Sequence, residues 1–557
     1  MRVILGVGVS AGLVVAPVRR MPDAVPEPAA GVVLPADDRE KAALRLVVAA
    51  DAVRADLEHR AESASETGRA VLEATALMAA DPTLEATATG LVRDAGLTPE
   101  RAIWQAANDV AAMLASLGGY MAERSRDVED VRDRIVAELT GRPAPGIPHS
   151  DVPFVLVAHD LAPADTATID VRSVRALVTA EGGPTSHTAI LARALGLPAI
   201  VAAKDAADLV DGDVVLVDGA AGRVVVEPDD DERARADKLA AAGPRTFDGT
   251  GRTASGTPVL LLANVGDAAG AQAAAAAGAQ GVGLFRTEFC FLDRTEPPTV
   301  TEQVAAYRGV LAQFPGRKVV VRTLDAGSDK PLPFVTATDE PNPALGVRGL
   351  RTVYRAPQLL EDQLAAIAQA ADAEQADVWV MAPMIATVDA THAFVERCHA
   401  HGLSVAGVMV EIPSAAICAD EILEVAGFAS IGTNDLTQYT LAADRLLGDL
   451  APLNDPWQPA LLRLVDMTCR AGGRRSRPVG VCGEAAADPA LACVLVGLGV
   501  DSLSMTARSI PDVAAALAGA SDEQCRAAAQ AAVGSGTAQA AREAARAQLP
   551  HLAELGL

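Results

Sequence analysis

Val259-Leu-Leu-Leu-Ala-Asn-Val265 is the first of eight short apolar segments that decide the fold of the second half of this chain. The other seven cover residues 281–285, 318–323, 378–383, 405–410, 428–432, 478–481 and 502–505, and helical patterns separate them. Short apolar runs bounded by turn residues are typical of buried strands, and strands that alternate with helices form parallel sheets. Residues 255–557 are therefore predicted to form a (β/α)8 barrel.

Charged and polar residues follow the ends of these predicted strands. They are Arg286 and Glu288 after the second segment, Arg322 and Asp325 after the third, Glu411 after the fifth, Asn434 and Asp435 after the sixth, and Cys482 and Glu484 after the seventh. Because the carboxyl ends of barrel strands meet at one face, we expect these side chains to converge on a single site.

The residue types at this face indicate phosphate chemistry. Glu411 and Asp435 are hard oxygen ligands of the kind that Mg²⁺ uses when a phosphorylated substrate completes its shell. Four cations could bind phosphate and carboxylate oxygens, namely Arg286, Arg322, Arg445 and Lys330. Each charge taken alone is more often a structural ion pair, and only the set as a whole favours a site. Cys482 is either a buried core thiol or a proton donor.

A second decisive stretch is Glu181-Gly-Gly-Pro-Thr-Ser-His-Thr-Ala-Ile-Leu-Ala-Arg-Ala-Leu-Gly-Leu-Pro-Ala-Ile200. A glycine turn, a possible cap at Thr185 or Ser186 and apolar residues at helical spacing place His187 in the first turn of a helix. There, unpaired N–H groups and the helix dipole favour an anion, so a phosphoryl group on the imidazole would be stabilised. The alternative is a histidine that only caps or packs the helix.

The first half of the chain predicts two further architectures. Residues 3–18 predict one or two strands, and runs at 37–64, 68–80, 99–117 and 120–139 predict a helical bundle. Short strands at 154–158, 176–179, 199–201 and 214–217, together with the His187 helix, predict an α/β domain. We therefore expect an α/β domain formed by residues 1–21 and 146–227, a helical insertion at 22–145 and a linker at 228–254.

Composition excludes several functions. The 557 residues carry a net charge of −25 and only 3% aromatic residues, which argues against nucleic-acid binding. The sequence has no run of 18 uninterrupted apolar residues, so it predicts no membrane-spanning helix. The seven cysteines show no CxxC spacing that would indicate a zinc site or a redox pair. We expect a cytoplasmic protein with reduced cysteines.

Six motifs carry a family resemblance. They are Gly182-Gly-Pro-Thr-Ser-His-Thr-Ala-Ile-Leu-Ala-Arg193, Gly283-Leu-Phe-Arg-Thr-Glu-Phe289, Val321-Arg-Thr-Leu-Asp325, Val408-Met-Val-Glu-Ile-Pro413, Gly432-Thr-Asn-Asp-Leu-Thr-Gln-Tyr439 and Val481-Cys-Gly-Glu484. Their order, nearly end to end, resembles enzyme I of the phosphoenolpyruvate-dependent sugar phosphotransferase system. The resemblance implies phosphorylation of His187 by phosphoenolpyruvate, release of pyruvate, and onward transfer to the phosphocarrier protein HPr.

The resemblance also implies individual roles. It implies that phosphoenolpyruvate is held by Arg286, Arg322, Asn434, Asp435 and Arg445. It further implies that Glu411 and Asp435 hold Mg²⁺, and that Cys482 protonates the enolpyruvate carbon. Residues 22–145 would dock HPr, the barrel would form a homodimer, and the domain of His187 would swivel between the barrel and HPr.

Three alternatives and three departures qualify this prediction. A dikinase or synthase would need a nucleotide-binding domain, and no GxxxxGK loop is present. A nitrogen-regulatory paralogue would carry an additional sensory domain, and a scaffold would have no need of intact His187, Cys482, Glu411 and Asp435. Pro184 stands where many members have arginine, Ala382 replaces a bulkier phenylalanine, and no histidine occurs around Ala74-Thr75, where some members' docking helix has one.

Overall fold

The computed structural model describes the chain from residue 2 to residue 557, apart from residues 23–24, 64–65, 118, 144–145, 149, 160, 162–168, 184–185, 244, 293, 327–331, 338–339 and 446. The chain divides into two compact units. One contains residues 1–15, 181–203 and 216–557, and the other contains residues 16–180 and 204–215.

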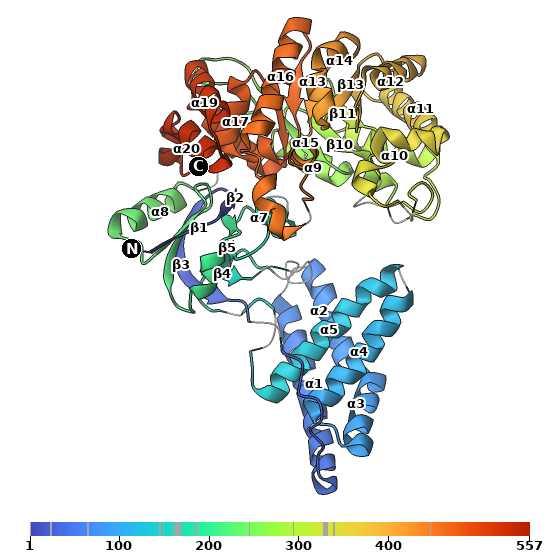
Figure 1. Ribbon diagram of the computed structural model, residues 1–557, viewed down its shortest axis with the longest axis vertical. Helices are drawn as coiled ribbons and strands as arrows, with labels where there is room; N and C mark the ends of the chain where they lie inside the picture. The colour runs from blue at the N-terminus through green and yellow to red at the C-terminus, as the bar shows by residue number, and fades with distance from the viewer. Residues whose placement is uncertain are drawn as a thin grey trace. The chain divides into compact units, whose positions relative to one another are not determined.

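The second half of the chain forms a closed barrel of eight parallel strands, as predicted (Figure 1). The strands are β9 (Leu260–Val265), β10 (Val282–Arg286), β11 (Lys318–Arg322), β12 (Asp377–Ala382), β13 (Ala406–Val410), β14 (Ala429–Ile431), β15 (Val479–Val481) and β16 (Ser502–Met505). The pairing of β16 with β9 closes the barrel, with Ser502 opposite Leu260. Each strand lies within two residues of its predicted bounds, because short β-branched and aliphatic runs fit the buried barrel wall.

Helices surround the barrel strands in Figure 1. They are α9 (Ala268–Ala276), α10 (Val300–Leu311), α11 (Pro357–Ala373), α12 (Val388–Ala400), α13 (Pro413–Ile417), α14 (Ala419–Val425), α15 (Thr433–Leu441), α16 (Pro459–Arg475), α17 (Pro489–Gly497), α18 (Ile510–Ala518), α19 (Asp522–Gly534), α20 (Ala538–Ala547) and α21 (His551–Leu555). One buried apolar cluster joins strands and helices, and it reaches Leu557 at the end of the alanine-rich tail. The tail therefore packs against the barrel.

A second sheet has eight strands in the order β1-β8-β7-β3-β4-β5-β6-β2. Its strands are β1 (Arg2–Leu5), β2 (Val7–Ser10), β3 (Leu13–Arg20), β4 (Phe154–Ala158), β5 (Val174–Thr179), β6 (Ala199–Val201), β7 (Val214–Asp218) and β8 (Arg223–Val226). The prediction of one or two N-terminal strands is wrong, since Gly6 and Gly12 divide this region into three. At Gly6 a Cβ would lie 2.6 Å from the Ile200 side chain, so the chain has no room for a side chain at this break.

The predicted helical bundle contains five helices rather than four. They are α1 (Ala36–Ser63), α2 (Glu66–Ala79), α3 (Pro82–Ala95), α4 (Pro99–Leu117) and α5 (Gly119–Thr140). Sequence reasoning missed α3 because its threonines and alanines give a weak apolar stripe. Its local signals were nevertheless present: the Asp81 carboxylate caps the first turn by accepting from the N–H of Thr83 and Leu84, and Gly96 ends the helix with φ 68°.

A short charged helix, α8 (Asp230–Ala242), follows the second sheet. It lies within the stretch predicted as a linker, and the Asp229 carboxylate caps it by accepting from the Glu232 N–H. No helix in the part of the chain that the structure describes combines the length and the apolar character needed to cross a membrane.

Candidate active site

His187 is the first residue of helix α7 (His187–Leu195), as predicted. Ser186 is the N-cap, and its hydroxyl accepts from the Ala189 N–H at 3.2 Å. This leaves the amides of the first turn at the end of the helix that favours anions. Pro184, Thr185 and the His187 side chain lie outside the described part of the structure.

Arg322, at the end of β11, lies among carboxylates at the carboxyl ends of the barrel strands. Its guanidinium pairs with Glu288 at 2.7 Å and with Asp325 at 2.9 Å. All three side chains are buried. Both carboxylates hold Arg322 in its charged form, and their attraction exceeds the opposing effect of burial on its pKa.

Arg348 extends this group of charges to the sixth strand. It pairs with Asp325 at 3.3 Å and with Asp435 at 3.1 Å, and Arg445 approaches the second oxygen of Asp435 at 3.4 Å. Strand-end reasoning predicted that Arg322, Asp325 and Asp435 would converge, and the structure joins all three in one network with Arg348 and Arg445.

Glu411 follows β13 and is completely buried. Its Oε1 accepts from the Met384 N–H at 2.5 Å, whereas its Oε2 has no hydrogen-bond partner within the described residues. Burial, reinforced by the carboxylates of Asp325 and Asp435, raises the pKa of Glu411 to about 8.

This arrangement fits a divalent cation. A buried carboxylate oxygen without a donor is costly unless a positive charge meets it, and a neighbouring carboxylate, Asp435, supplies further oxygens of the type that Mg²⁺ prefers. The described residues contain no cluster of three or more histidine, cysteine or acidic ligands. Any ion at Glu411 and Asp435 would therefore take oxygens from substrate and water as well.

Cys482 directly follows β15 and is buried beside the same network. Its Sγ lies 3.7 Å from the carbonyl oxygen of Ile431. Burial raises the pKa of the Cys482 thiol to about 11, and this effect exceeds the opposing effects of a hydrogen bond with Ser430 and of the charge on Arg322. The thiol therefore keeps its proton at neutral pH and has one to donate.

Arg286 and Asn434 occupy strand-end positions outside the ion-pair network. Arg286 ends β10, is partly exposed, and has no ion-pair partner among the described residues. Asn434 lies in the first turn of α15, where its Oδ1 accepts from the Glu484 N–H at 3.1 Å. Lys330, the fourth predicted cation, falls outside the residues that the structure describes.

Buried hydrogen bonds hold the Arg322 strand end in place. Thr287 Oγ1 donates to the Arg322 carbonyl oxygen at 2.7 Å. The Gln363 amide donates to Thr287 Oγ1 and to the Tyr307 hydroxyl, both at 3.0 Å, while its Oε1 accepts from the Leu324 N–H at 2.8 Å. Since all of these groups are buried and satisfied, the backbone that carries the arginine is rigid.

Arg348 is the site residue that sequence reasoning missed. It lies just before the short helix η4 (Gly349–Tyr354), in the long connection between β11 and β12, and so it follows no strand directly. The only available signal was the pair of arginines in Val347-Arg-Gly-Leu-Arg351, which pattern alone cannot distinguish from surface charges.

Comparison with known families assigns all three regions of the chain to phosphoenolpyruvate-utilising enzymes. Residues 5–124 match the family described as "PEP-utilising enzyme, N-terminal", where PEP denotes phosphoenolpyruvate. Residues 151–222 match its mobile domain, and residues 245–521 match its PEP-binding domain.

Curated relatives agree over nearly the full length. A phosphoenolpyruvate-protein phosphotransferase of Streptomyces coelicolor is 52% identical over 98% of both chains. Proteins of the same name from Haloferax volcanii and Geobacillus stearothermophilus are 41% and 37% identical, over 83% and 91% of this chain and 84% and 92% of their own. The chain therefore belongs to the family of phosphoenolpyruvate-protein phosphotransferases.

Proposed function

We propose that this enzyme transfers the phosphoryl group of phosphoenolpyruvate to His187 in a reaction that requires Mg²⁺, and then passes it to a histidine of HPr for sugar uptake. The observation that carries the proposal is the barrel-end network, in which arginines gather around Asp325 and Asp435 next to the unpartnered oxygen of buried Glu411.

Arginines and an amide would bind the substrate. Forked donors to its phosphate and carboxylate oxygens would come from Arg286, Arg322 and Arg445. Arg348 would be a fourth such donor, because it lies in the same network beside Asp435. Asn434 and Asp435 lie on the first turn of α15 and would complete the contacts. Because Arg322, Arg348 and Arg445 are already held by carboxylates, these three side chains lose little freedom when the substrate binds.

Glu411 and Asp435 would hold the Mg²⁺. The bound ion would neutralise charge on the phosphoryl oxygens and on the enolate that leaves. Glu411 would lose its proton on binding the cation, since a nearby positive charge opposes the burial that raises its pKa.

The reaction can then be written with every bond and proton assigned. The unprotonated ring nitrogen of neutral His187 attacks phosphorus, a P–N bond forms, and the bond from phosphorus to the enol oxygen breaks. The proton on the other ring nitrogen then passes to water, which leaves a neutral imidazole ring on the phosphohistidine. The enolate takes a proton at its methylene carbon from the Cys482 thiol, which gives pyruvate, and the thiolate regains a proton from water. The arginines stabilise the charge that develops on the transferred group.

Transfer to HPr would use the helical region. Acidic helices at residues 22–145 suit a basic partner, and we assign this region to HPr docking. We assign residues 1–21 and 146–227 to the swivelling phosphohistidine domain, 228–254 to its linker, and 255–557 to substrate binding and homodimerisation.

The decisive experiment measures labelling from radioactive phosphoenolpyruvate with Mg²⁺. We expect an acid-labile, base-stable label that His187→Ala abolishes. His392→Ala, which removes an exposed histidine on α12, is the matched control and should be labelled like the unaltered protein. Labelling that requires ATP would instead indicate a dikinase.

A second reaction tests the acceptor. The phosphorylated enzyme, freed of phosphoenolpyruvate, is mixed with HPr, and label should move to HPr. Label that stays on the enzyme would contradict HPr as the acceptor while leaving the first transfer intact.

A further inference from the structure

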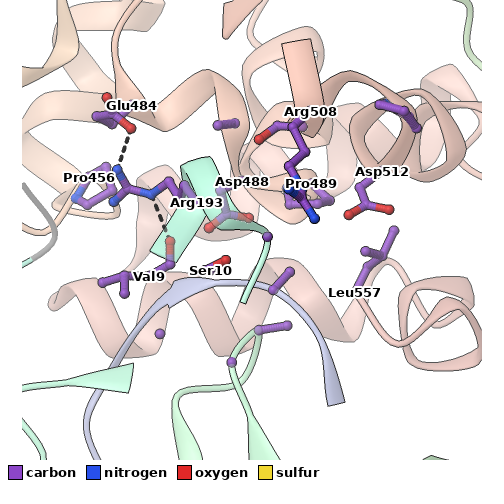
Figure 2. Close-up of a pocket in the computed structure, with 18 of the residues that line it drawn as sticks. Val9, Ser10, Arg193, Pro456, Glu484, Asp488, Pro489, Arg508, Asp512 and Leu557 are labelled. Atoms are coloured by element: carbon purple, nitrogen blue, oxygen red, sulfur yellow. Dashed lines mark hydrogen bonds and ion pairs between the residues drawn. The ribbon is translucent and has the colours of Figure 1, made fainter. Parts of the chain in front are cut away.

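The His187 helix contacts the barrel through Arg193, within the compact unit that contains both (Figure 2). The Arg193 Nε donates to the Val9 carbonyl oxygen at 2.8 Å, and Nη1 forms an ion pair with the Glu484 carboxylate. The contact borders a cavity of about 440 Å³, and the two side chains are only 10% and 21% exposed. Such shielding makes the pair stronger than a surface ion pair.

These bonds from Arg193 to Val9 and Glu484 reach two different parts of the chain. Val9 lies in β2, which packs with α7, so the first bond fixes the guanidinium relative to the helix that carries His187. The second bond reaches Glu484, the first residue of η6 (Glu484–Ala487), just beyond barrel strand β15. The planar guanidinium fork presents donors to both partners from fixed positions, which favours arginine over lysine here.

Glu484 connects the ion pair to the substrate site. Its N–H donates to Asn434 Oδ1 at 3.1 Å, and it lies two positions after Cys482. The residue that holds the His187 helix is therefore hydrogen-bonded to Asn434, assigned above to substrate binding, and close in the chain to Cys482, assigned to proton donation.

A second contact lies at the end of the same helix. Gly196 is the α7 C-cap with φ 65°, and a Cβ there would lie 2.3 Å from Nε of Arg508, in η7 (Ala507–Ser509) after β16. The carboxyl-terminal half of α7 therefore rests on the segments that follow two adjacent barrel strands, β15 and β16.

We propose, on the basis of the function proposed above, that Arg193 is a positioning residue for the first phosphoryl transfer. His187 precedes it by six positions on one helix, which is about 9 Å along the helix axis. Pairing of Arg193 with Glu484 fixes that helix against the barrel while His187 is phosphorylated. HPr takes the phosphoryl group without this pair, so Arg193 serves only the step with phosphoenolpyruvate.

The test separates the two transfers in Arg193→Lys, Arg193→Gln and Glu484→Gln. At saturating phosphoenolpyruvate we expect labelling of His187 to slow by about 100-fold in the two glutamine variants, because a misplacement of about 1 Å has that effect. The lysine variant, which keeps the charge, should recover part of the rate. The KM for phosphoenolpyruvate and the rate of transfer from phosphorylated enzyme to HPr should stay within about 2-fold.

Arg172→Gln is the matched control, because it removes an exposed ion pair, Arg172 with Asp170, from the same sheet region. It should leave both transfers unchanged. The double variant Arg193→Gln/Glu484→Gln should be no slower than either single variant, since one interaction is lost in all three.

The outcomes distinguish this inference from the function on which it rests. An unaltered enzyme that phosphoenolpyruvate does not label would overturn the proposed function. Normal labelling of the unaltered enzyme with equally fast labelling of the Arg193 variants would overturn only the positioning role. An equal loss in both transfers, or multiplicative losses in the double variant, would also overturn it, since either would indicate general damage to the helix.

Discussion

Arg348→Met is the substitution that most directly probes the charge network. Arg348 is 4% exposed and bridges Asp325 and Asp435, which are 6% and 9% exposed. Methionine fills much of the same volume but removes the charge. Two buried carboxylates then lose a shared cation close to a third, Glu411.

The magnitude follows from these contacts. Removing one partner of a buried ion pair costs about 3–5 kcal/mol, because the remaining charge is left uncompensated. Arg322 and Arg445 still hold one oxygen each of Asp325 and Asp435, which places the expected loss near the lower end of that range. At about 2–4 °C per kcal/mol for a domain of this size, the unfolding temperature of the barrel should fall by roughly 6–12 °C.

Added Mg²⁺ makes the prediction sharper. With Arg348 absent, the carboxylates are freer to bind a cation, so Mg²⁺ should raise the unfolding temperature of the variant more than that of the unaltered protein. Differential scanning calorimetry with and without Mg²⁺ measures both effects. Arg355→Met is the control, because Arg355 is 37% exposed and meets Glu340 only at 3.7 Å; it should change stability by less than about 1 kcal/mol. An Arg348→Met protein that melts like Arg355→Met would refute the reasoning that the bridge compensates buried charge.

Three further predictions concern groups whose pKa is perturbed. Cys482→Ala should slow pyruvate formation by about 10²–10⁴-fold with little change in phosphoenolpyruvate binding, as rapid-quench and equilibrium binding would measure; an unchanged rate would remove its role as proton donor. Without Mg²⁺, the folded protein holds the Glu411 proton up to about pH 8 but the unfolded chain only to about 4.5, so stability falls as pH rises across that window. In Glu411→Gln, the melting temperature should fall less as pH rises, and Mg²⁺-dependent labelling should be abolished. A pH profile identical to that of the unaltered protein would contradict the raised pKa of Glu411. Burial lowers the pKa of Lys318 from 10.5 to about 8, so its contribution to stability rises with pH between those values. The Lys318 ammonium lies 3.6 Å from the centre of the Trp379 ring, and this contact offsets part of the cost of burying the charge. Lys318→Met should therefore stabilise the protein at pH 7 by only about 1–2 kcal/mol. A loss of stability in this variant would show that the ring contact outweighs the cost of burial.

Local pattern was sufficient for most elements of the fold. The barrel strands and the helix of residues 99–117 were predictable because apolar periodicity, glycine and proline operate over a few residues. Local sequence pattern did not predict α3 and β8, where the local signal is weak and packing against distant segments determines the secondary structure. Strand β8, for example, is stabilised by antiparallel pairing of Arg223 with Leu5 and of Val226 with Arg2, more than 200 positions away.

The candidate site shows the same division. Strand-end reasoning found Arg322, Asp325 and Asp435, because a barrel places all its strand ends at one face. It could not find Arg348, which a connection of more than 50 residues between β11 and β12 delivers to that face. Strand-end reasoning also could not identify Glu484 as the ion-pair partner of Arg193, because the two residues lie in motifs that are far apart in the sequence.

The sequence by itself determined which chemistry this protein carries: a histidine at a helix start, carboxylates and arginines after barrel strands, and a cysteine among them. Only the tertiary structure decided how these groups act on one another. Burial raises the pKa of Glu411 and Cys482, and the bridge of Arg348 and the ion pair of Arg193 depend on segments that meet only in the folded chain. The physical reason is that residue type is local, whereas desolvation and electrostatic interaction depend on every neighbour that folding brings within a few ångströms.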